Sequence, residues 1–356
     1  MHKQAQAILD WIDEVVDIRE RATVRGKVRN FNAFLAVTKI ALIAALLLSL
    51  LPISNVSAQE AKKPKIGALT KSLANPYFLR MKEGYEYAQK KLGVDLVFGS
   101  TPTEEADVEQ LNILQSWFAE GSFQGFVVTP FRPTSLNTTL AMVSRKNVPI
   151  VNIDELIPEE AAAADRIKIV TRIASNNVEA GRLQAQLLLK SLPQGAKVAI
   201  IEGDPGTTSS RDRVTGFAST AKEGGLTIIA SQPANWNRKK AYELASSILK
   251  AAPELGAFAV ANDDMALGVL RAVQESGAAG KVIVVSVDGI PDALEAIKEG
   301  SLAGTVTQYP EAMAYLGVET LLKKLNGESV PEKIDSPIKL ITKDNLADAD
   351  WYFEEK

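Results

Sequence analysis

The sequence of 356 residues contains no cysteine, and its one histidine is His2, beside the N-terminus. Thiolate nucleophiles, disulfide bonds and metal sites built from Cys or His are therefore excluded. No imidazole is available inside a folded core for acid–base catalysis, and a lipid-modified cysteine anchor is excluded as well. Because most hydrolase and redox mechanisms lose their usual parts, we expect a protein that is not an enzyme and needs no cofactor.

An excess of positive charge is also absent, since 40 Lys and Arg residues face 43 Asp and Glu residues, for a net charge of -3. A mildly acidic chain is poorly suited to duplex DNA, so no nucleic-acid partner is expected. The composition is otherwise that of a globular protein, with 46% hydrophobic and 23% charged residues. A chain of this length has enough apolar mass for two cores, and two domains are the first expectation.

The longest apolar run covers residues 40–51, IALIAALLLSLL, which is short of the roughly 20 residues that span a bilayer core. Basic residues precede this run, and Pro52 and the small residues Val56 and Ala58 follow it. This order is typical of a signal peptide with its hydrophobic region at 40–51. We therefore expect residues 1–58 to be an N-terminal extension plus a signal peptide that directs export. A retained membrane anchor is the alternative.

Short β-branched runs alternate with stretches of helical periodicity throughout the remaining chain. The first set of runs lies at 65–70, 94–99, 125–130 and 148–154, and the second at 197–203, 226–231, 257–263 and 281–288. Repeated strand–helix units of this kind predict an α/β fold with two doubly wound parallel sheets. A late helix at 310–325 and an extended stretch at 338–341 could return the chain to both lobes, which indicates several crossings between them.

Local signals support the helices. A helix is predicted to begin at Pro76 and to end at Gly93, with one apolar face in between. Asp263 is expected to cap a second helix, and Pro291 stands where a first helical turn tolerates proline.

Polar and aromatic residues directly follow the predicted strands. In open parallel sheets, ligands bind outside the carboxyl ends of the strands, so these positions are the candidate site. Carboxylates and amides bond to sugar hydroxyls, while flat aromatic rings such as that of Trp236 pack against the C–H face of a sugar ring. The candidates at the strand ends are Lys71, Asn75, Tyr77, Phe78, Asp154, Glu155, Asn262 and Asp288.

Each candidate also has a purely structural explanation. Asn75 and Asn262 have the character of helix starts or caps, and the pair Asp154 and Glu155 suits a solvated loop. Trp236 would equally fit a hydrophobic core. Sequence physics alone leaves these alternatives open.

Eight strings in fixed order carry a resemblance to a known family. They are ANPYF, NIDE, SNNVEAG, GDPGTTSSRDRVTGF, SQPANWNR, ANDDMALG, VSVDGIPDA and GTVTQYP. From about Pro64 to its end, the sequence resembles the ribose-type family of periplasmic sugar-binding proteins, which belong to ABC importers. Single strings of this length are weak signals, whereas eight in this order over nearly 300 residues are specific.

The resemblance implies two α/β lobes joined by three hinge strands and closing on one monosaccharide. It places the first lobe at 64–175 and 309–337, and the second at 176–308 and 338–356. It also implies that Asn176 and Gln308 lie near lobe crossings. Arg213 replaces Arg211 if the loop before them aligns differently; by default both arginines would be exposed. The implied sugar contacts are Asn75, Tyr77, Phe78, Asp154, Arg211, Trp236, Asn262, Asp288 and Gln308.

Within that family, departures from the ribose pattern narrow the choice of the expected sugar. Ribose-specific members carry arginine after the aspartate matched by Asp154, where this chain has Glu155, and phenylalanine where this chain has Val287. Lys71, Glu155 and Trp236 are instead similar to the allose-binding branch. A hexose similar to D-allose is therefore the expected ligand, with ribose or a polyol as alternatives.

The resemblance implies a monomeric protein of the periplasm whose partners are an ABC transporter permease and its ATPase. A chemoreceptor or a sensor kinase is a further expected partner. A sugar-responsive repressor shares such a core but needs an N-terminal DNA-reading headpiece, and a hydrophobic run stands in its place here. A nucleotide-dependent enzyme needs a phosphate-binding glycine loop, and the nearest candidate, GDPGTTSS, lacks the lysine and the spacing.

Overall fold

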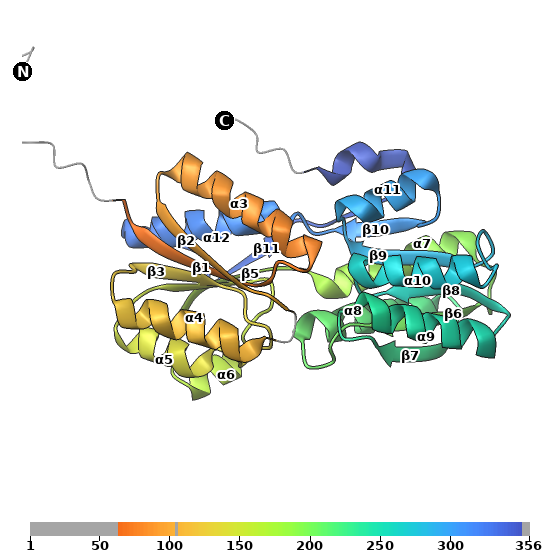
Figure 1. Cartoon of the computed structure of the whole chain (residues 1–356), viewed down its shortest axis with the longest axis horizontal. Coiled ribbons are helices and arrows are strands. Elements are labelled where there is room, and N and C mark those ends of the chain that lie inside the picture. Colours follow the sequence, from red (N-terminus) through yellow and green to blue (C-terminus); the bar gives the residue numbers. More distant parts are fainter. Residues whose placement is uncertain (1–62, 104–105, 351–356) are drawn as a thin grey trace, which may run out of the picture. The chain divides into compact units, whose positions relative to one another are not determined.

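The computed structural model describes residues 63–103 and 106–350, which contain two six-stranded sheets flanked by helices (Figure 1). The predicted signal peptide lies outside the described residues. Within the described ranges, no helix has the length and apolar character needed to cross a bilayer.

The first sheet has the strand order β11-β5-β4-β3-β1-β2, and every neighbouring pair in it is parallel. With the helices that pack on it, this sheet is called the first lobe below. Its strands are β1 (Lys65–Ser72), β2 (Asp95–Thr101), β3 (Gly125–Val128), β4 (Ile150–Ile153), β5 (Ile169–Ser175) and β11 (Lys333–Ser336).

The second sheet has the order β12-β10-β9-β8-β6-β7 and forms the second lobe with its helices. The strands from β10 to β7 run parallel, and β12 pairs antiparallel to β10 at the edge. Its strands are β6 (Lys197–Glu202), β7 (Thr227–Pro233), β8 (Leu255–Val260), β9 (Ile283–Asp288), β10 (Gly304–Thr307) and β12 (Lys339–Ile341).

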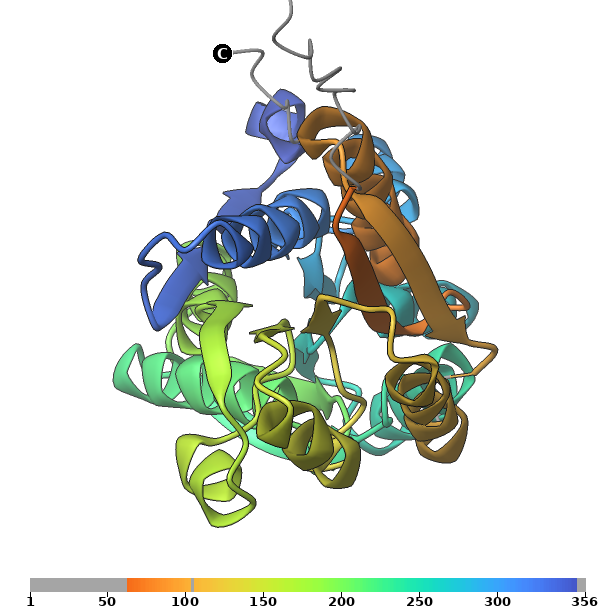
Figure 2. The same cartoon turned by 90° about the vertical axis from the view of Figure 1, so that its left-hand side faces the viewer.

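Helices cover both faces of the first sheet. Helix α12 contacts α3 and strands β3 to β5, while α4 contacts β1, β2 and α5. Figure 2 shows α12 in blue and α3 in orange on one side of this sheet, opposite α4 to α6. The helices are α3 (Pro76–Leu92), α4 (Asp107–Glu120), α5 (Asn137–Arg145), α6 (Glu159–Ala164) and α12 (Pro310–Leu325).

The second sheet is covered in the same manner. Helix α7 packs on α8 and against β9 and β10, whereas α10 packs between α9 and α11. The helices are α7 (Asn177–Ser191), α8 (Thr208–Glu223), α9 (Arg238–Ala251), α10 (Asp263–Glu275), α11 (Pro291–Glu299) and the 3₁₀ segment η1 (Lys343–Ala349). Two doubly wound parallel-sheet lobes, the predicted fold class, are therefore confirmed.

The chain passes between the two sheets three times. It leaves the first sheet after β5 to enter α7, returns after β10 to enter α12, and passes from β11 directly to β12. The residues between Thr307 and Pro310 form one of these passages, and Gln308 lies in it.

Local sequence signals explain the helix ends. Asn75 caps α3 by accepting a hydrogen bond from the Tyr77 backbone N–H, and Gly93 ends the helix at φ 66°. The predicted bounds of this helix and of the one at 310–325 are confirmed. The expected cap at Asp263 is wrong, because Asn262 caps α10 and accepts from the Met265 N–H at 3.0 Å.

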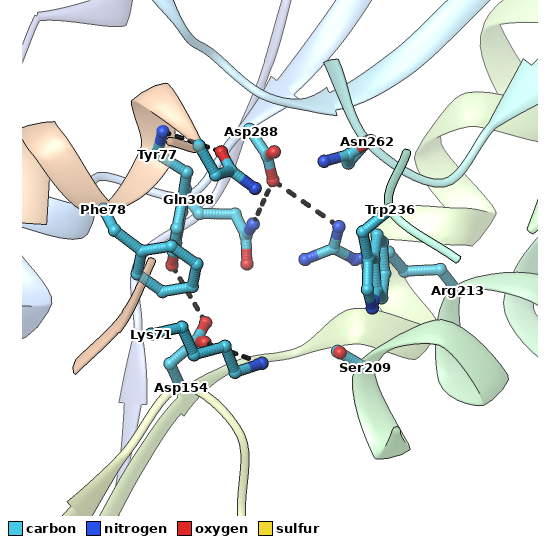
Figure 3. A pocket seen from close by; sticks show the side chains of 11 residues that line it. Lys71, Tyr77, Phe78, Asp154, Ser209, Arg213, Trp236, Asn262, Asp288 and Gln308 are labelled. Carbon is cyan, nitrogen blue, oxygen red and sulfur yellow. Dashed lines mark hydrogen bonds and ion pairs between the residues drawn. The ribbon is translucent and has the colours of Figure 1, made fainter. Parts of the chain in front are cut away.

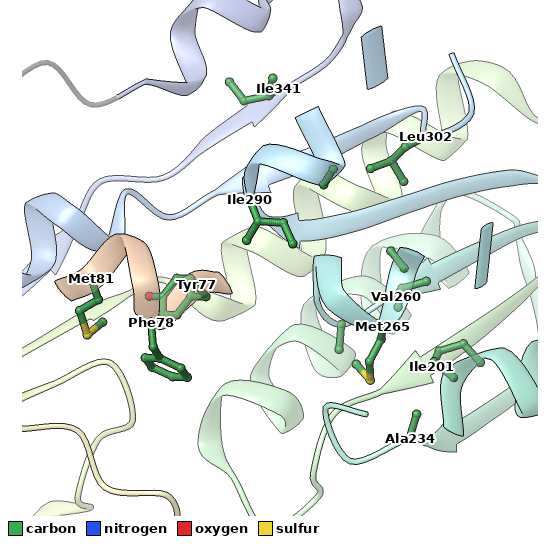
Figure 4. Packing of buried hydrophobic residues seen from close by; sticks show 14 of the residues in the cluster. Tyr77, Phe78, Met81, Ile201, Ala234, Val260, Met265, Ile290, Leu302 and Ile341 are labelled. Carbon is green, nitrogen blue, oxygen red and sulfur yellow. The ribbon is translucent and has the colours of Figure 1, made fainter. Parts of the chain in front are cut away.

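The largest core cluster contains residues of both lobes. It includes Tyr77 and Met81 of the first lobe and Val260, Met265 and Ile341 of the second (Figure 4). Burying such side chains stabilises a fold by roughly 1.5 to 3 kcal/mol each. Apolar packing therefore stabilises the interior of both lobes, and the polar residues of the candidate site lie at the strand ends.

Glycine permits the closest helix contact, between α7 and α8. A Cβ atom at Gly216 would lie 1.9 Å from the backbone oxygen of Val178, and one at Gly181 would lie 2.0 Å from that of Arg213. No side chain larger than hydrogen fits at either position without separating the helices. Because α8 also carries Arg213, the close contact between α7 and α8 fixes the backbone position of Arg213.

We expect Gly216→Ala to lower the free energy of unfolding by about 1 to 3 kcal/mol, although alanine is the better helix former. Chemical denaturation measures the change. The control is Ser219→Ala on the exposed face of the same helix, which should alter stability by less than about 0.5 kcal/mol. A Gly216→Ala protein as stable as the wild type would contradict the close contact.

Candidate functional site

A cavity lies where the carboxyl ends of the two sheets face each other (Figure 3). The first lobe lines it from the ends of β1 and β4 and from the first turn of α3, and the second lobe from the ends of β7 to β10 and from α8. The lining residues are Lys71, Asn75, Tyr77, Phe78, Asp154, Ser209, Arg213, Trp236, Asn262, Asp288 and Gln308.

The polar group of the first lobe is centred on Asp154. The Tyr77 hydroxyl donates to Asp154 Oδ1 at 3.1 Å, and Lys71 Nζ lies 3.8 Å from Asp154 Oδ2. Burial, and then the Asp154 charge, raise the pKa of Tyr77 well above its usual value, so its hydroxyl keeps its proton at physiological pH. This side of the cavity therefore presents a carboxylate already oriented by one hydroxyl and one ammonium.

Asp288 is the centre of the polar group in the second lobe. Gln308 Nε2 donates to Asp288 Oδ1 at 2.7 Å, and Arg213 Nη1 lies 3.5 Å from the same oxygen. Arg213 is held by two further bonds, to Asn177 Oδ1 at 2.8 Å and to the Ala261 carbonyl at 2.6 Å. Desolvation raises the pKa of Asp288, and the Arg213 charge opposes that rise.

Aromatic rings supply flat apolar surfaces in the same cavity. Tyr77 and Phe78 meet edge to face with ring centroids 5.1 Å apart. The Arg213 guanidinium lies 5.6 Å from the centroid of the Trp236 ring, which packs directly on Gly203. Any side chain at residue 203 would collide with this ring, so glycine there sets the position of the indole.

Two lining groups have polar atoms that no group in the described part of the chain satisfies. Trp236 Nε1 and Gln308 Oε1 are buried and have no hydrogen-bond partner among the described residues. Leaving a buried donor or acceptor unpaired costs about 1 to 3 kcal/mol. A donor and an acceptor thus line the cavity ready for a hydroxyl-bearing molecule.

Three lining residues adopt left-handed backbone conformations that side-chain-bearing residues rarely occupy. These are Asp154 at φ 62°, Trp236 at φ 60° and Asp288 at φ 136°. Such strain costs roughly 1 to 3 kcal/mol per residue and persists only where the surroundings hold it. Its concentration in the cavity lining indicates that the backbone is shaped to aim these side chains.

Asp263 holds the backbone around Asp288 in place. Its Oδ2 accepts from the N–H groups of Gly289 at 2.7 Å and Ile290 at 2.9 Å, and its Oδ1 accepts from the hydroxyls of Ser286 and Thr305. Burial raises the pKa of Asp263 to about 6, while these four donors act to lower it. Asp263 therefore holds the backbone of the site in position. It is not the helix cap that the sequence predicted.

The structure brings most of the expected site residues together. Those that line the cavity are Lys71, Asn75, Tyr77, Phe78, Asp154, Trp236, Asn262, Asp288 and Gln308. Asn262 and Asn75 also cap helices, so for these two residues the structural and the site explanations hold at once.

Arg211 does not line the cavity. Its guanidinium donates to the Pro205 carbonyl at 2.9 Å on the exposed side of α8, and Arg213 faces the cavity instead. Residues two positions apart on an α-helix point about 200° apart around its axis, so only one of Arg211 and Arg213 can face inward. Ser209, missed from sequence, lies one turn before Arg213 on the same face, which is the spacing that could have identified it.

Glu155 and Val287 also lie outside the cavity lining. Glu155 is fully buried and accepts hydrogen bonds from the start of α8, namely from Thr208 N at 2.6 Å and Ser209 Oγ at 2.8 Å. Val287 packs in a small apolar cluster with Ala180. Neither residue therefore borders the ligand cavity, although the departures from the ribose pattern fall on both.

Two α/β lobes with a polar and aromatic cavity between their strand ends define a binding protein for a small polar molecule. Residues 66–329 match the family model described as periplasmic binding protein domain. The chain belongs to this family.

Relatives across most of the chain support the assignment. The ribose import binding protein of Escherichia coli is 32% identical over 302 residues, which are 85% of this chain and 97% of that protein. The D-allose-binding periplasmic protein of Escherichia coli is 32% identical over 264 residues, 73% of this chain and 85% of that protein.

A solved structure agrees with the fold. The periplasmic solute-binding protein of an ABC transporter from Actinobacillus succinogenes, with bound D-allose, is similar with a TM-score of 0.77 and 30% identity. The similarity covers 80% of this chain and all of that chain.

We expect Asp263→Asn to change how stability depends on pH. A carboxyl with a pKa of about 6 when folded and of roughly 3.9 when unfolded favours the folded state most below the unfolded value. That advantage is lost as pH rises through about 6, at a cost of about 3 kcal/mol. Asparagine does not titrate, yet it can accept from the two N–H groups and donate to the two hydroxyls.

Urea denaturation at pH 4.5 and pH 7 measures this difference. The Asp263→Asn protein should lose less stability, or gain more, between the two pH values than the wild type. Asp264→Asn, next to it but paired with Arg238 at 2.6 Å and outside the cavity, should follow the wild type. Identical pH profiles for all three proteins would contradict the assigned role.

Proposed function

We propose that this chain is the sugar-binding component of an ABC importer, which holds one monosaccharide between its lobes and delivers it to a membrane permease driven by an ATPase. The supporting observation is the composition of one cavity. Carboxylates, an arginine, amides and aromatic rings from both lobes converge there, and Trp236 Nε1 and Gln308 Oε1 have no protein partner among the described residues.

A neutral monosaccharide matches this lining. Its hydroxyls can donate to Asp154 and Asp288 and accept from Arg213 and the Trp236 N–H, while its C–H face can pack on Phe78. A binding role needs no catalytic group, and we propose that the chain is not an enzyme.

Among sugars, we propose an aldohexose similar to D-allose, with ribose or a polyol as alternatives. Lys71 and Trp236, two of the residues that resemble the allose-binding branch, do line the cavity. Identity does not separate the two sugars, because the ribose and allose relatives are equally similar at 32%. The structural neighbour with bound D-allose favours the hexose.

We propose further that the protein is exported to the periplasm and acts as a monomer. Residues 1–58 have the order of an n-region, an apolar run and a small-residue cleavage site, and the family is that of periplasmic binding proteins. The proposed first lobe spans 64–175 and 309–337, and the proposed second lobe 176–308 and 338–356. A chemoreceptor or sensor kinase would recognise the same form of the protein as the permease, in which the two lobes are closed around the sugar.

The carboxylates of both lobes give the first test. Asp154→Ala and Asp288→Ala should each abolish detectable binding of the best monosaccharide found in a thermal-shift screen, because sugar hydroxyls would be left unpaired in a dry cavity. Isothermal titration calorimetry measures affinity, and circular dichroism checks that each variant is folded.

A matched control is Asp264→Ala, a carboxylate of the second lobe outside the cavity. It should bind like the wild type. Wild-type affinity in both cavity variants, or no heat from any monosaccharide with the wild type, would refute the proposed function.

The two arginines of α8 give a second test. Arg213→Lys should weaken sugar binding by at least about tenfold, since lysine cannot reproduce the forked bonds of a guanidinium. Arg211→Lys should bind like the wild type, because Arg211 lies on the exposed face. Calorimetry of both variants decides between the two residues, and the opposite result would restore Arg211 as the sugar contact.

A further inference from the structure

Glu155 belongs to the first lobe, but its carboxylate is bound by the second. The residue follows β4, and its two oxygens accept from Thr208 N at 2.6 Å and from Ser209 Oγ at 2.8 Å at the first turn of α8. Glu155 Oε2 also lies 3.8 Å from Lys71 Nζ. The carboxylate therefore occupies the positive end of a helix that belongs to the opposite lobe.

Burial shields this contact from solvent. The Glu155 side chain has no exposed surface, so water and salt screen its interactions with α8 much less than those of an exposed pair. By contrast, the ion pair between Arg132 Nη2 and Asp204 Oδ2, which also joins the lobes at 2.9 Å, is about half exposed on the arginine side. Exposed pairs of this kind contribute little.

The contact can exist only while the lobes are together. Glu155 is carried by the end of β4 and its two donors by α8, so any separation of the lobes at the cavity parts the carboxylate from both. Asp154, the neighbour of Glu155, lies across the cavity from Arg213, and the same separation of the lobes moves these two residues apart. Ser209 belongs both to the Glu155 contact and to the cavity, because it donates to Glu155 and also lines the cavity.

We propose that Glu155 is a positioning residue that latches the closed form by capping α8 across the lobes, without touching the sugar. The proposal rests on the proposed sugar-binding function. Closure then draws on the sugar contacts and, among other contacts between the lobes such as the bond from Arg80 to the Gly289 carbonyl, on the Glu155 contact. Since the Glu155 contact is independent of the sugar, it should strengthen the binding of every monosaccharide by the same factor and should act by slowing release.

The test compares Glu155→Ala and Glu155→Gln with the wild type, each purified after expression of the full chain. D-Allose, D-ribose and D-galactose are titrated by calorimetry, and stopped-flow measurement of the intrinsic tryptophan fluorescence, to which Trp236 in the cavity contributes, follows association and dissociation. Glu155→Ala should weaken binding of each sugar that the wild type binds by the same factor, roughly tenfold or more, through faster dissociation. Glu155→Gln keeps the size and one acceptor and should lie between the two.

Glu160→Ala is the matched control, because this glutamate follows the same strand but is exposed on α6. It should release each sugar at the wild-type rate. If Glu155→Ala fails to fold, Glu155→Gln carries the comparison.

Three outcomes would overturn the latch or its basis. Unchanged affinity in both Glu155 variants shows that the contact does not hold the closed form. A changed order of preference among the sugars shows that Glu155 touches the ligand and determines specificity. Absence of binding by the wild type to every sugar tested refutes the proposed function itself, and with it the latch.

Discussion

The buried carboxylate of Asp288 is the constraint on which the site depends. A charge in a dry interior is stable only if it is paired and hydrogen-bonded. Arg213 and Gln308 meet that requirement, and they come from a helix of the second lobe and from a passage between the lobes. One buried charge thus connects the second sheet, helix α8 and a lobe crossing, so a ligand that bonds to Asp288 is linked through Gln308 to a passage between the lobes.

The surroundings of this charge are built to keep it in a strained position. Asp288 has a φ of 136°, and the two N–H groups that follow it are bonded to Asp263. Asp154, its counterpart in the first lobe, has a φ of 62°, and its carboxylate accepts a hydrogen bond from Tyr77 and lies near the Lys71 ammonium. Protein contacts therefore hold both carboxylates facing the cavity, which reduces the ordering cost of binding.

The fold was largely predictable from sequence because β-branched runs and helix signals alternate without interruption. The pattern did not indicate β5, β10 and β11, since Arg172 interrupts the apolar run of β5 and the other two strands each contain a single large apolar residue. Crossing points between lobes depend on contacts far apart in sequence, and only the resemblance supplied their number.

The site was predictable in kind, and less so residue by residue. The rule that ligands bind at the carboxyl ends of strands identified Asp154, Asn262 and Asp288. It could not decide which of two arginines on α8 faces inward, because that depends on where Thr207 starts the helix. Nor could it separate Asp154 from the adjacent Glu155, since the left-handed turn at Asp154 directs the two side chains to different partners.

A crystal structure of the protein with its tightest-binding monosaccharide tests the central claim most directly. We predict one sugar in the cavity, with hydroxyls within hydrogen-bond distance of Asp154 in one lobe and of Asp288 and Arg213 in the other. A sugar bound to one lobe alone, or at a site that none of these three residues reaches, would contradict the account.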